Sequence, residues 1–355
     1  MTINDIANAR LHGQMIARQK FKTTAQVVRY MGAMQAQEFA MCKWAVGLRL
    51  PKATDATVQQ ALDNGEILRT HLMRPTWHLV CADDIHWLLE LTAPHVLQLS
   101  KSHWKQRGLA DDVFKKTNKL IVKALEKDKC LAREDFRPIF EKAGYQTADN
   151  ALSHYMGRAE LDMLVCSGPM QGNRQTYMLL DERVPKRKTL APDEALAELA
   201  TRYFTAHAPA TLQDFVWWTG LPVALAKKAI ASVESTLKII KAGGTEYYVM
   251  KSWRMPAVKD AVYLLPAFDE YMISYKDRSV AIDPKHYKKT ITSNGIFWPT
   301  VVVNGKIEGL WKRTIKGDTV KIETDMFGKV SKAIKEQVEA EAQRIAAFLQ
   351  LELKP

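Results

Sequence analysis

The 355-residue sequence has few cysteines, no long apolar run and no excess of acidic residues. Cys42, Cys81, Cys130 and Cys166 lie far apart and form no CxxC pair, which argues against a zinc site and a disulfide framework. We expect these cysteines to be reduced and buried in a cytoplasmic protein. No run approaches about 18 apolar residues, and the charged N-terminus lacks a signal-peptide core, so no membrane partner is expected.

The common catalytic motifs are also missing. The sequence contains no GxxxxGK[ST] phosphate loop, no GxGxxG, no HExxH and no GxSxG. Nucleotide hydrolysis, dinucleotide redox chemistry and zinc proteolysis therefore find no support, and neither a cofactor nor a metal is expected. A Cys/His or Ser/His nucleophilic site stays open, because its members need not be close in sequence.

The charge balance is basic. Lys and Arg number 51 against 39 Asp and Glu, a formal net charge of +12, and 47% of residues are hydrophobic. The composition is that of a globular protein, and the length suits two to three domains of roughly 100–200 residues. The charge favours a nucleic-acid partner, with an acidic protein, a membrane surface or mere solubility as alternatives.

A run of three short helices and a hairpin is predicted for residues 111–180. An apolar stripe indicates a helix over 111–128, a short helix follows and stops at Gly144, and Thr147 can cap a third over 148–164. Residues 164–180 read as two strands around a turn rich in Gly, Asn and Pro. This order is typical of a winged helix, whose third helix can enter a major groove.

The same order recurs on both sides of this run. Residues 192–250 predict three helices and a hairpin that turns at Gly243-Gly244. Residues 1–81 predict helices near 5–19, 24–34 and 55–64, and then two strands. The spacing is too loose for self-similarity to prove a repeat, so the order of elements carries the interpretation.

The C-terminal part has a different character. Strand-type runs fill residues 261–327, with a hairpin turn at Asn304-Gly305, and a helix over about 329–350 closes the chain. The basic segment 183–188 is either a solvated connector or a phosphate contact. We therefore predict an α+β protein with domains at 1–110, 111–182, 190–258 and 261–355.

Two segments could carry chemistry. Gln35-Ala36-Gln37 lies at or just past the end of a predicted helix, and both amides can serve one target only if the chain leaves the helix there. Two solvated glutamines at a helix end are the plainer alternative. The second segment is the hairpin over 69–80, which concentrates Arg and His side chains suited to phosphate, or is an ordinary basic hairpin around a buried tryptophan.

Several motifs together carry a family resemblance. The segments ARLHGQMIARQ, VVRYMGAMQAQ, LRTHLMRPTWHLV, LLPAFDEYMISYKDRS and FWPTVVVNGKIEGLWKR resemble those of bacterial tandem winged-helix DNA glycosylases of the AlkZ-like, azinomycin-resistance type. The resemblance spans nearly the whole chain. It implies a C-shaped monomer with three winged helices and a C-terminal β-barrel-like module. It also implies a catalytic Gln-x-Gln motif, which Gln35 and Gln37 match; a sister branch has Asp at the last position.

The resemblance implies a monofunctional glycosylase that acts on alkylated purines in double-stranded DNA. An amide is a very poor base, but an N7-alkylguanine is already cationic and leaves readily. Two amide carbonyls then need only to position water and face developing positive charge. We expect Gln37 to orient the water and Gln35 to hold it or stabilise the sugar cation, with Glu38 turned away.

The sequence also suggests DNA-binding residues. The basic and polar candidates come from the hairpin, the segments after it, the 183–188 segment and the fourth resembling motif: Arg69, His71, Arg74, Thr76, His78, Lys101, Lys105, Arg107, Arg174, Lys186, Arg187 and Arg278. The histidines could equally be satisfied structural residues. A non-catalytic DNA-binding protein or regulator is the alternative function, and a protein-interaction scaffold is the third. The sequence does not distinguish crosslinks from monoadducts.

Overall fold

The computed structural model describes residues 1–257 and 260–354 of the chain. The chain divides into two compact units, each assembled from segments distant in sequence. The first unit contains Met1–Gln59, Leu196–Trp218 and Val223–Pro355, and the second contains Gln60–Ala195 and Thr219–Pro222. The mixture of helices and mainly antiparallel strands confirms the α+β class, whereas the four predicted domain boundaries stay a prediction.

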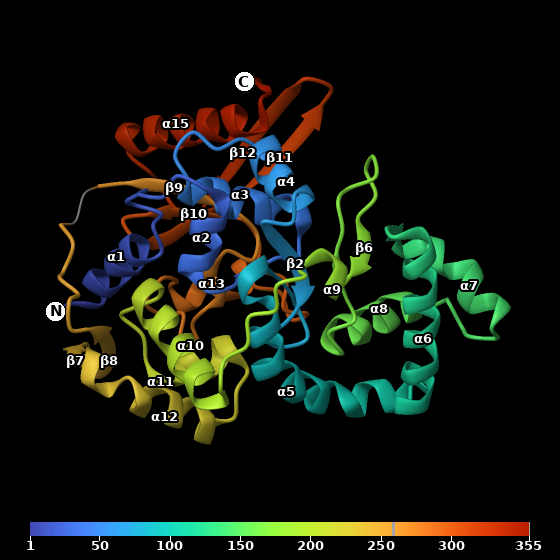
Figure 1. Ribbon diagram of the computed structural model, residues 1–355. Helices are drawn as coiled ribbons and strands as arrows, with labels where there is room; N and C mark the ends of the chain where they lie inside the picture. Colours follow the sequence, from blue (N-terminus) through green and yellow to red (C-terminus); the bar gives the residue numbers. More distant parts are fainter. Residues whose placement is uncertain (258–259, 355) are drawn as a thin grey trace. The chain divides into compact units, whose positions relative to one another are not determined.

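Helices from three parts of the chain build the first unit (Figure 1). Their bounds are α1 Ile3–Gly13, α2 Thr24–Met31, α3 Phe39–Arg49, α11 Leu212–Thr219, α12 Val223–Ser232, α13 Glu270–Ile273, α14 Tyr287–Thr290 and α15 Lys332–Leu349. Helices α4 Asp55–Asp63 and α10 Pro192–Ala206 span the points where the chain passes from one unit's segments to the other's. The two-residue strand β1, Met34–Gln35, lies between α2 and α3 in the chain.

A five-stranded sheet forms the C-terminal part of the first unit. Its order is β13 Glu352–Lys354, β12 Thr319–Met326, β11 Lys306–Lys316, β10 Thr300–Val303 and β9 Val262–Leu265. All neighbours are antiparallel except the parallel β12–β13 pair, and the sheet is open because β9 and β13 end the order. The expected β module is therefore present. The hairpin β7 Leu237–Ala242 and β8 Thr245–Met250 forms a separate two-stranded sheet.

Helices α3 and α15 pack together beside this sheet, and α15 also contacts β9 (Figure 1). The rings of Trp44 and Phe348 lie 5.1 Å apart, and Gly47 permits this approach because a Cβ there would lie 2.3 Å from the Phe348 ring. The Trp44 indole N–H donates to the Leu264 carbonyl at 2.9 Å. This contact ties α3 to the strand that leads into α13.

The second unit contains the predicted helix–helix–helix–hairpin run. Its elements are β2 Ile67–His71, β3 Trp77–Cys81, α5 Ile85–Gln106, α6 Asp111–Asp128, β4 Leu131–Ala132, α7 Arg137–Lys142, α8 Ala151–Leu161, β5 Val165–Ser167, β6 Thr176–Leu179 and α9 Leu180–Arg183. Helix α8 packs on α5 and α6, and β4, β6 and β5 form one sheet in that order. The side chains of Phe114, Phe136, Phe140 and Tyr155 fill the space between the helices.

Some predicted boundaries are wrong. The helix expected over 148–164 begins only at Ala151, because the Thr147 hydroxyl is engaged by Glu141 and Arg137 and cannot cap it. The helix expected near 5–19 ends at Gly13, where Met15 turns into the left-handed region with φ 60°. Helices α3 and α5 were not expected at all. The hairpins at Gly243-Gly244 and Asn304-Gly305 are confirmed.

Candidate active site

The Gln-x-Gln segment lies between two well-defined helix ends. Helix α2 begins with a capping box at Thr23 and buries Val27, Val28 and Met31 along one face. It ends at Gly32, whose φ of 81° lies in the left-handed region that glycine adopts without strain. The chain therefore leaves the helix before the motif, which is the condition that the sequence set for the two glutamines.

The two glutamines differ in exposure. Gln35 ends β1 and is 5% exposed, Ala36 is fully buried, and Gln37 is exposed. Glu38 then caps α3, because its carboxylate accepts the Met41 N–H at 2.7 Å. Glu38 is therefore committed to the helix, a role that the sequence analysis did not predict. The motif thus has one amide anchored in the protein and one amide facing outward.

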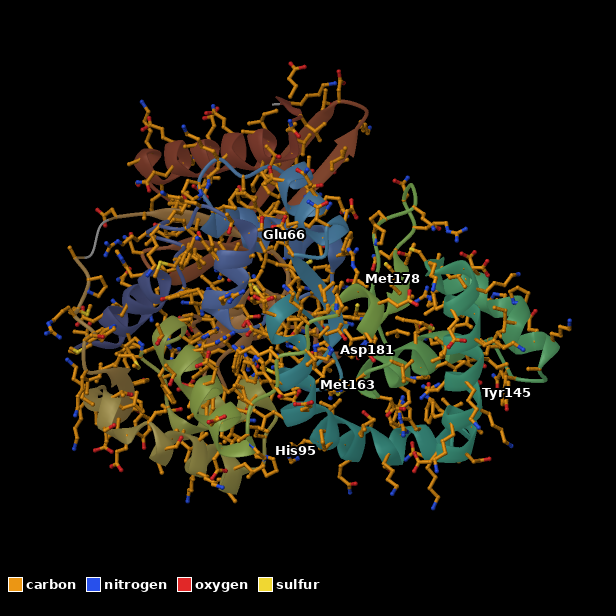
Figure 2. All side chains as sticks on the ribbon, viewed as in Figure 1. Glu66, His95, Tyr145, Met163, Met178 and Asp181 are labelled. Carbon is orange, nitrogen blue, oxygen red and sulfur yellow. The ribbon has the colours of Figure 1, made fainter. Side chains whose placement is uncertain are left out.

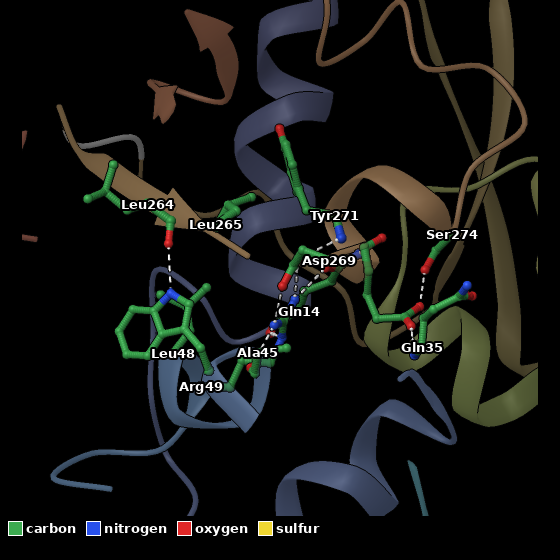
Figure 3. Close-up of polar contacts among 12 residues, drawn as sticks. Gln14, Gln35, Ala45, Leu48, Arg49, Leu264, Leu265, Asp269, Tyr271 and Ser274 are labelled. Carbon is green, nitrogen blue, oxygen red and sulfur yellow. Dashed lines mark hydrogen bonds and ion pairs between the residues drawn. The ribbon is translucent and has the colours of Figure 1, made fainter. Parts of the chain in front are cut away.

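A buried carboxylate lies directly beside the motif (Figure 3). The Glu270 carboxylate, on α13, accepts the backbone N–H of Gln35 at 2.5 Å. It also accepts the Trp218 indole N–H at 3.1 Å and the hydroxyl of Ser274. Glu270 is 2% exposed. The segment that carries the first glutamine is therefore fastened to a carboxylate from the C-terminal part of the chain.

The contacts of Glu270 favour its ionised form. Burial raises the pKa of Glu270, but the nearby His207 and the hydrogen bonds from Ser274 and the Gln35 N–H more than offset this and hold the pKa well below its ordinary range. The His207 Nε2 atom lies 3.6 Å from the carboxylate, and burial lowers the pKa of His207. The imidazole is thus neutral near pH 7 while the carboxylate is charged.

A second buried network of hydrogen bonds holds the start of α13 in place (Figure 3). Arg49 donates to both carboxylate oxygens of Asp269 at 2.8 and 2.9 Å, and Asp269 caps α13. The Gln14 amide nitrogen donates to the Glu270 carbonyl at 3.2 Å and to the Tyr275 hydroxyl at 3.0 Å. These contacts fix the turn on which Glu270 sits.

Sequence reasoning missed Glu270 and His207 as site residues. The signal for Glu270 was present, because its segment LLPAFDEYMISYKDRS places two adjacent acidic residues within an otherwise apolar run. Buried acidic residues need specific partners, so such a pair suggests a polar centre. Nothing in the sequence connects that segment with Gln35, 235 positions away.

Several DNA-binding candidates are buried. In the second unit, Arg69 is 8% exposed, donates to Gln175 at 2.7 Å and lies 4.3 Å from the Trp77 ring centroid. His71 is paired with Glu160, and His78 is fully buried. In the first unit, Arg278 is 8% exposed and donates to the Met272 carbonyl. In this structure, these side chains are engaged in contacts within the protein.

The exposed candidates all belong to the second unit. Arg74 and Thr76 are half-buried in the turn between β2 and β3. The exposed residues are Lys101, Lys105, Arg107, Arg174, Lys186 and Arg187. Arg174 pairs with Asp135, and Arg187 pairs with Glu90 at 2.5 Å. Figure 2 shows long side chains extending outward from the ribbons of α5 and α6.

Histidines line a pocket of about 390 Å³ in the second unit. His71, His103 and His154 face it together with Leu99 and Trp104. Burial, together with nearby Arg107, lowers the pKa of His154. No group of three or more His, Cys, Asp or Glu side chains among the described residues could hold a metal ion. Across the same residues, no helix is long and apolar enough to cross a membrane.

The whole chain has known relatives. The profile of the family described as DNA glycosylase AlkZ-like matches residues 28–348. The chain belongs to the AlkZ-like DNA glycosylase family. It is therefore a DNA glycosylase. The interpretations of the chain as a non-catalytic regulator or as a scaffold are not favoured. The resemblance that the sequence motifs indicated is confirmed.

Two known proteins are similar to this chain over most or all of its length. An interstrand DNA cross-link repair glycosylase from Streptomyces sahachiroi is 22% identical over 320 residues, which cover 85% of each chain. The solved structure of the Streptomyces sahachiroi DNA glycosylase AlkZ superposes with a TM-score of 0.81 at 20% identity, and covers 100% of this chain and 99% of that one. The second comparison shows a shared α+β fold.

Proposed function

We propose that this AlkZ-like glycosylase hydrolyses the N-glycosidic bond of cationic alkylpurines, above all N7-alkylguanine, in duplex DNA without cutting the strand. The observation that carries this proposal is the Gln35-Ala36-Gln37 segment, with one amide buried and one exposed. Neither amide can act as an effective base. Such a site suits a base that leaves readily because it already carries a positive charge.

The different environments of the glutamines support different roles. Gln37 is exposed, so its amide can reach a water molecule at the sugar of a bound nucleotide and orient it for attack. Gln35 is fixed through its backbone by Glu270, so its segment provides a rigid support for Gln37. In our proposal, a carbonyl of the motif also faces the positive charge that develops on the sugar.

The exposed cations of the second unit support duplex binding. Lys101, Lys105, Arg107 and Lys186 present positive charge without base-specific geometry, as phosphate contacts require. We interpret each helix–helix–helix–hairpin run as a winged helix, and we expect the enzyme to act as a monomer. In this proposal, buried Arg69, His78 and Arg278 stabilise the fold, and exposed residues contact the phosphates.

Crosslinked guanines are a second substrate class within this proposal. The relative from Streptomyces sahachiroi is named an interstrand DNA cross-link repair glycosylase, and it matches 85% of this chain. A crosslinked base cannot be turned fully out of the duplex, so an exposed Gln37 suits it better than an enclosed base pocket would.

Release of 7-methylguanine from methylated duplex DNA tests the proposal. Single-turnover rates would be compared for wild type, Gln35→Ala, Gln37→Ala and the control Gln343→Ala, an exposed glutamine on α15. We expect the Gln37 variant to lose at least about tenfold, because a lost polar group at a reacting centre commonly costs that much or more. The control should retain the wild-type rate.

Two outcomes would contradict the proposal. Equal release by wild type and both motif variants would remove the glutamines from the chemistry. Efficient release of uracil, a neutral base that needs stronger activation, would show that the site does not depend on a cationic leaving group.

A further inference from the structure

The Gln-x-Gln motif carries no charge, but the group beneath it does. A glycosylase transition state places positive charge on the sugar, and a cationic alkylpurine brings positive charge to the site before reaction. Amide dipoles can face this charge but do not balance it. The proposed function therefore leaves open which group of this chain supplies the negative charge.

We propose that Glu270 is the positioning residue of this site: it holds the Gln35 peptide and supplies the fixed negative charge that the two amides lack. The inference rests on the proposed function, since it concerns the same site and the same cationic sugar. It adds a residue that acts through the motif and through its field, without touching the substrate.

The hydrogen bonds of Glu270 show how the charge is kept. The Gln35 N–H at 2.5 Å, the Trp218 indole at 3.1 Å and the Ser274 hydroxyl all donate to the carboxylate. All three donors are neutral, so they stabilise the anion without cancelling its charge. The donors come from β1, α11 and the end of α13, so the carboxylate connects three parts of the first unit.

His207 does not neutralise the carboxylate at neutral pH. Its Nε2 atom lies 3.6 Å from Glu270, beyond hydrogen-bond distance. The ring is fully buried and stacks on Tyr203, with centroids 4.8 Å apart. Burial lowers the pKa of His207 and so favours the neutral imidazole beside the carboxylate.

A charge is not needed for the structural part of this role. A glutamine at position 270 could accept the Gln35 N–H through its amide oxygen and donate to the Ser274 hydroxyl, so that only the Trp218 N–H loses its acceptor. A buried ionised group that a neutral isostere could replace suggests a functional demand. Because the carboxylate is buried, its charge is screened less than that of an exposed group, and in our proposal its field acts on the sugar bound at the motif.

The test uses duplexes with an abasic-site analogue in place of the lesion. A pyrrolidine analogue carries a positive charge where the sugar cation forms, and a tetrahydrofuran analogue is its neutral counterpart. We expect wild type to bind the pyrrolidine duplex at least about fivefold more tightly. Glu270→Gln should lose this preference and keep its affinity for the tetrahydrofuran duplex.

Single-turnover release of 7-methylguanine provides the second measurement. Glu270→Gln should lose about tenfold or more in rate. Ser274→Ala removes one donor to the same carboxylate and keeps the charge, so it should retain most of the rate and the full pyrrolidine preference. If Glu270→Gln fails to fold, Glu270→Asp takes its place as a variant that keeps the charge and should keep the preference.

The outcomes separate this inference from the proposed function. A folded Glu270→Gln protein that still prefers pyrrolidine as strongly as wild type would overturn the role of Glu270, whatever the activity. A folded Glu270→Asp protein without any preference would do the same. Wild type that prefers pyrrolidine but releases no 7-methylguanine would contradict only the proposed substrate.

Discussion

At the scale of single residues, the site depends on buried polar groups whose partners are specific. Arg49 and Asp269 are 0% and 1% exposed, and their two parallel hydrogen bonds hold the start of α13. Arg49 also donates to the Ala45 carbonyl and to both the backbone and the side chain of Gln14. The pair thus connects α1, α3 and α13, and Glu270 follows it by one position.

Replacing Arg49 tests the importance of this pair. Arg49→Met removes one partner and leaves the Asp269 carboxylate buried without its cation, which we expect to cost about 3–5 kcal/mol in the free energy of unfolding. Urea-induced unfolding followed by circular dichroism measures the change. The exposed pair Lys332–Glu336 on α15 provides the control, and Lys332→Ala should leave the midpoint essentially unchanged. Similar midpoints for both variants would contradict the prediction.

At the scale of elements, the site is the short connection between α2 and α3. Gly32 ends the first helix and Glu38 begins the second, so only five residues lie between these two caps. Each end is defined locally, by a left-handed glycine and by a side-chain cap. Because the helices are anchored by buried faces, the connection has little freedom, and the glutamines keep their places.

Glu38 allows the cap to be separated from the chemistry. Glu38→Ala removes the acceptor of the Met41 N–H and should cost about 0.5–1 kcal/mol of stability. Glu38→Gln keeps an acceptor oxygen and loses the charge, so stability should fall less. Thermal unfolding checks the first effect, and single-turnover release of 7-methylguanine should be within about threefold of wild type for Glu38→Gln. A large loss of rate in Glu38→Gln would instead make Glu38 a participant in the reaction.

At the scale of the whole molecule, the proposed chemistry and the proposed phosphate contacts belong to different units. The motif and Glu270 lie in the first unit, whereas the exposed cationic candidates, from Lys101 to Arg187, lie in the second. The formal net charge of +12 attracts a phosphate backbone, and it comes almost entirely from the first unit, because the second contains 20 Lys and Arg against 19 Asp and Glu. In our proposal, the second unit contributes to the affinity for undamaged DNA through individual exposed side chains such as Lys101, Lys105 and Arg107, while the rate of base release depends on the first unit.

Salt dependence measures this division. Each lost phosphate contact lowers the slope of log K against log salt concentration by about 0.9, so Lys101→Ala/Lys105→Ala/Arg107→Ala should lower it by ~2–3. Fluorescence anisotropy with an undamaged duplex measures the slope. The control is Lys241→Ala, an exposed residue of the first unit paired with Glu246 at 3.0 Å, and it should keep the wild-type slope. An unchanged slope in the triple variant would place the phosphate contacts elsewhere.

Local patterns in the sequence predicted much of the fold but little of the site's surroundings. The hairpins and the C-terminal β module depend on turn residues and periodicity, which neighbouring positions reveal, whereas the helix expected near 24–34 already ends at Met31. Helix α3 was missed because it is apolar almost all round and shows no clear stripe. Arg69 was expected to contact DNA but is buried against the Trp77 ring. A cation in a hairpin can take either role, and the local sequence does not decide between them.

By itself, the sequence determined the Gln35-Ala36-Gln37 motif, the family, the basic charge and the absence of the common cofactor motifs. These depend on residue identities and short spacings. Only the tertiary structure decided that Gln35 is buried and Gln37 exposed, and that Glu270 accepts the Gln35 N–H from 235 positions away. The physical reason is that burial and electrostatic environment depend on contacts between distant segments, and these form only when the chain packs.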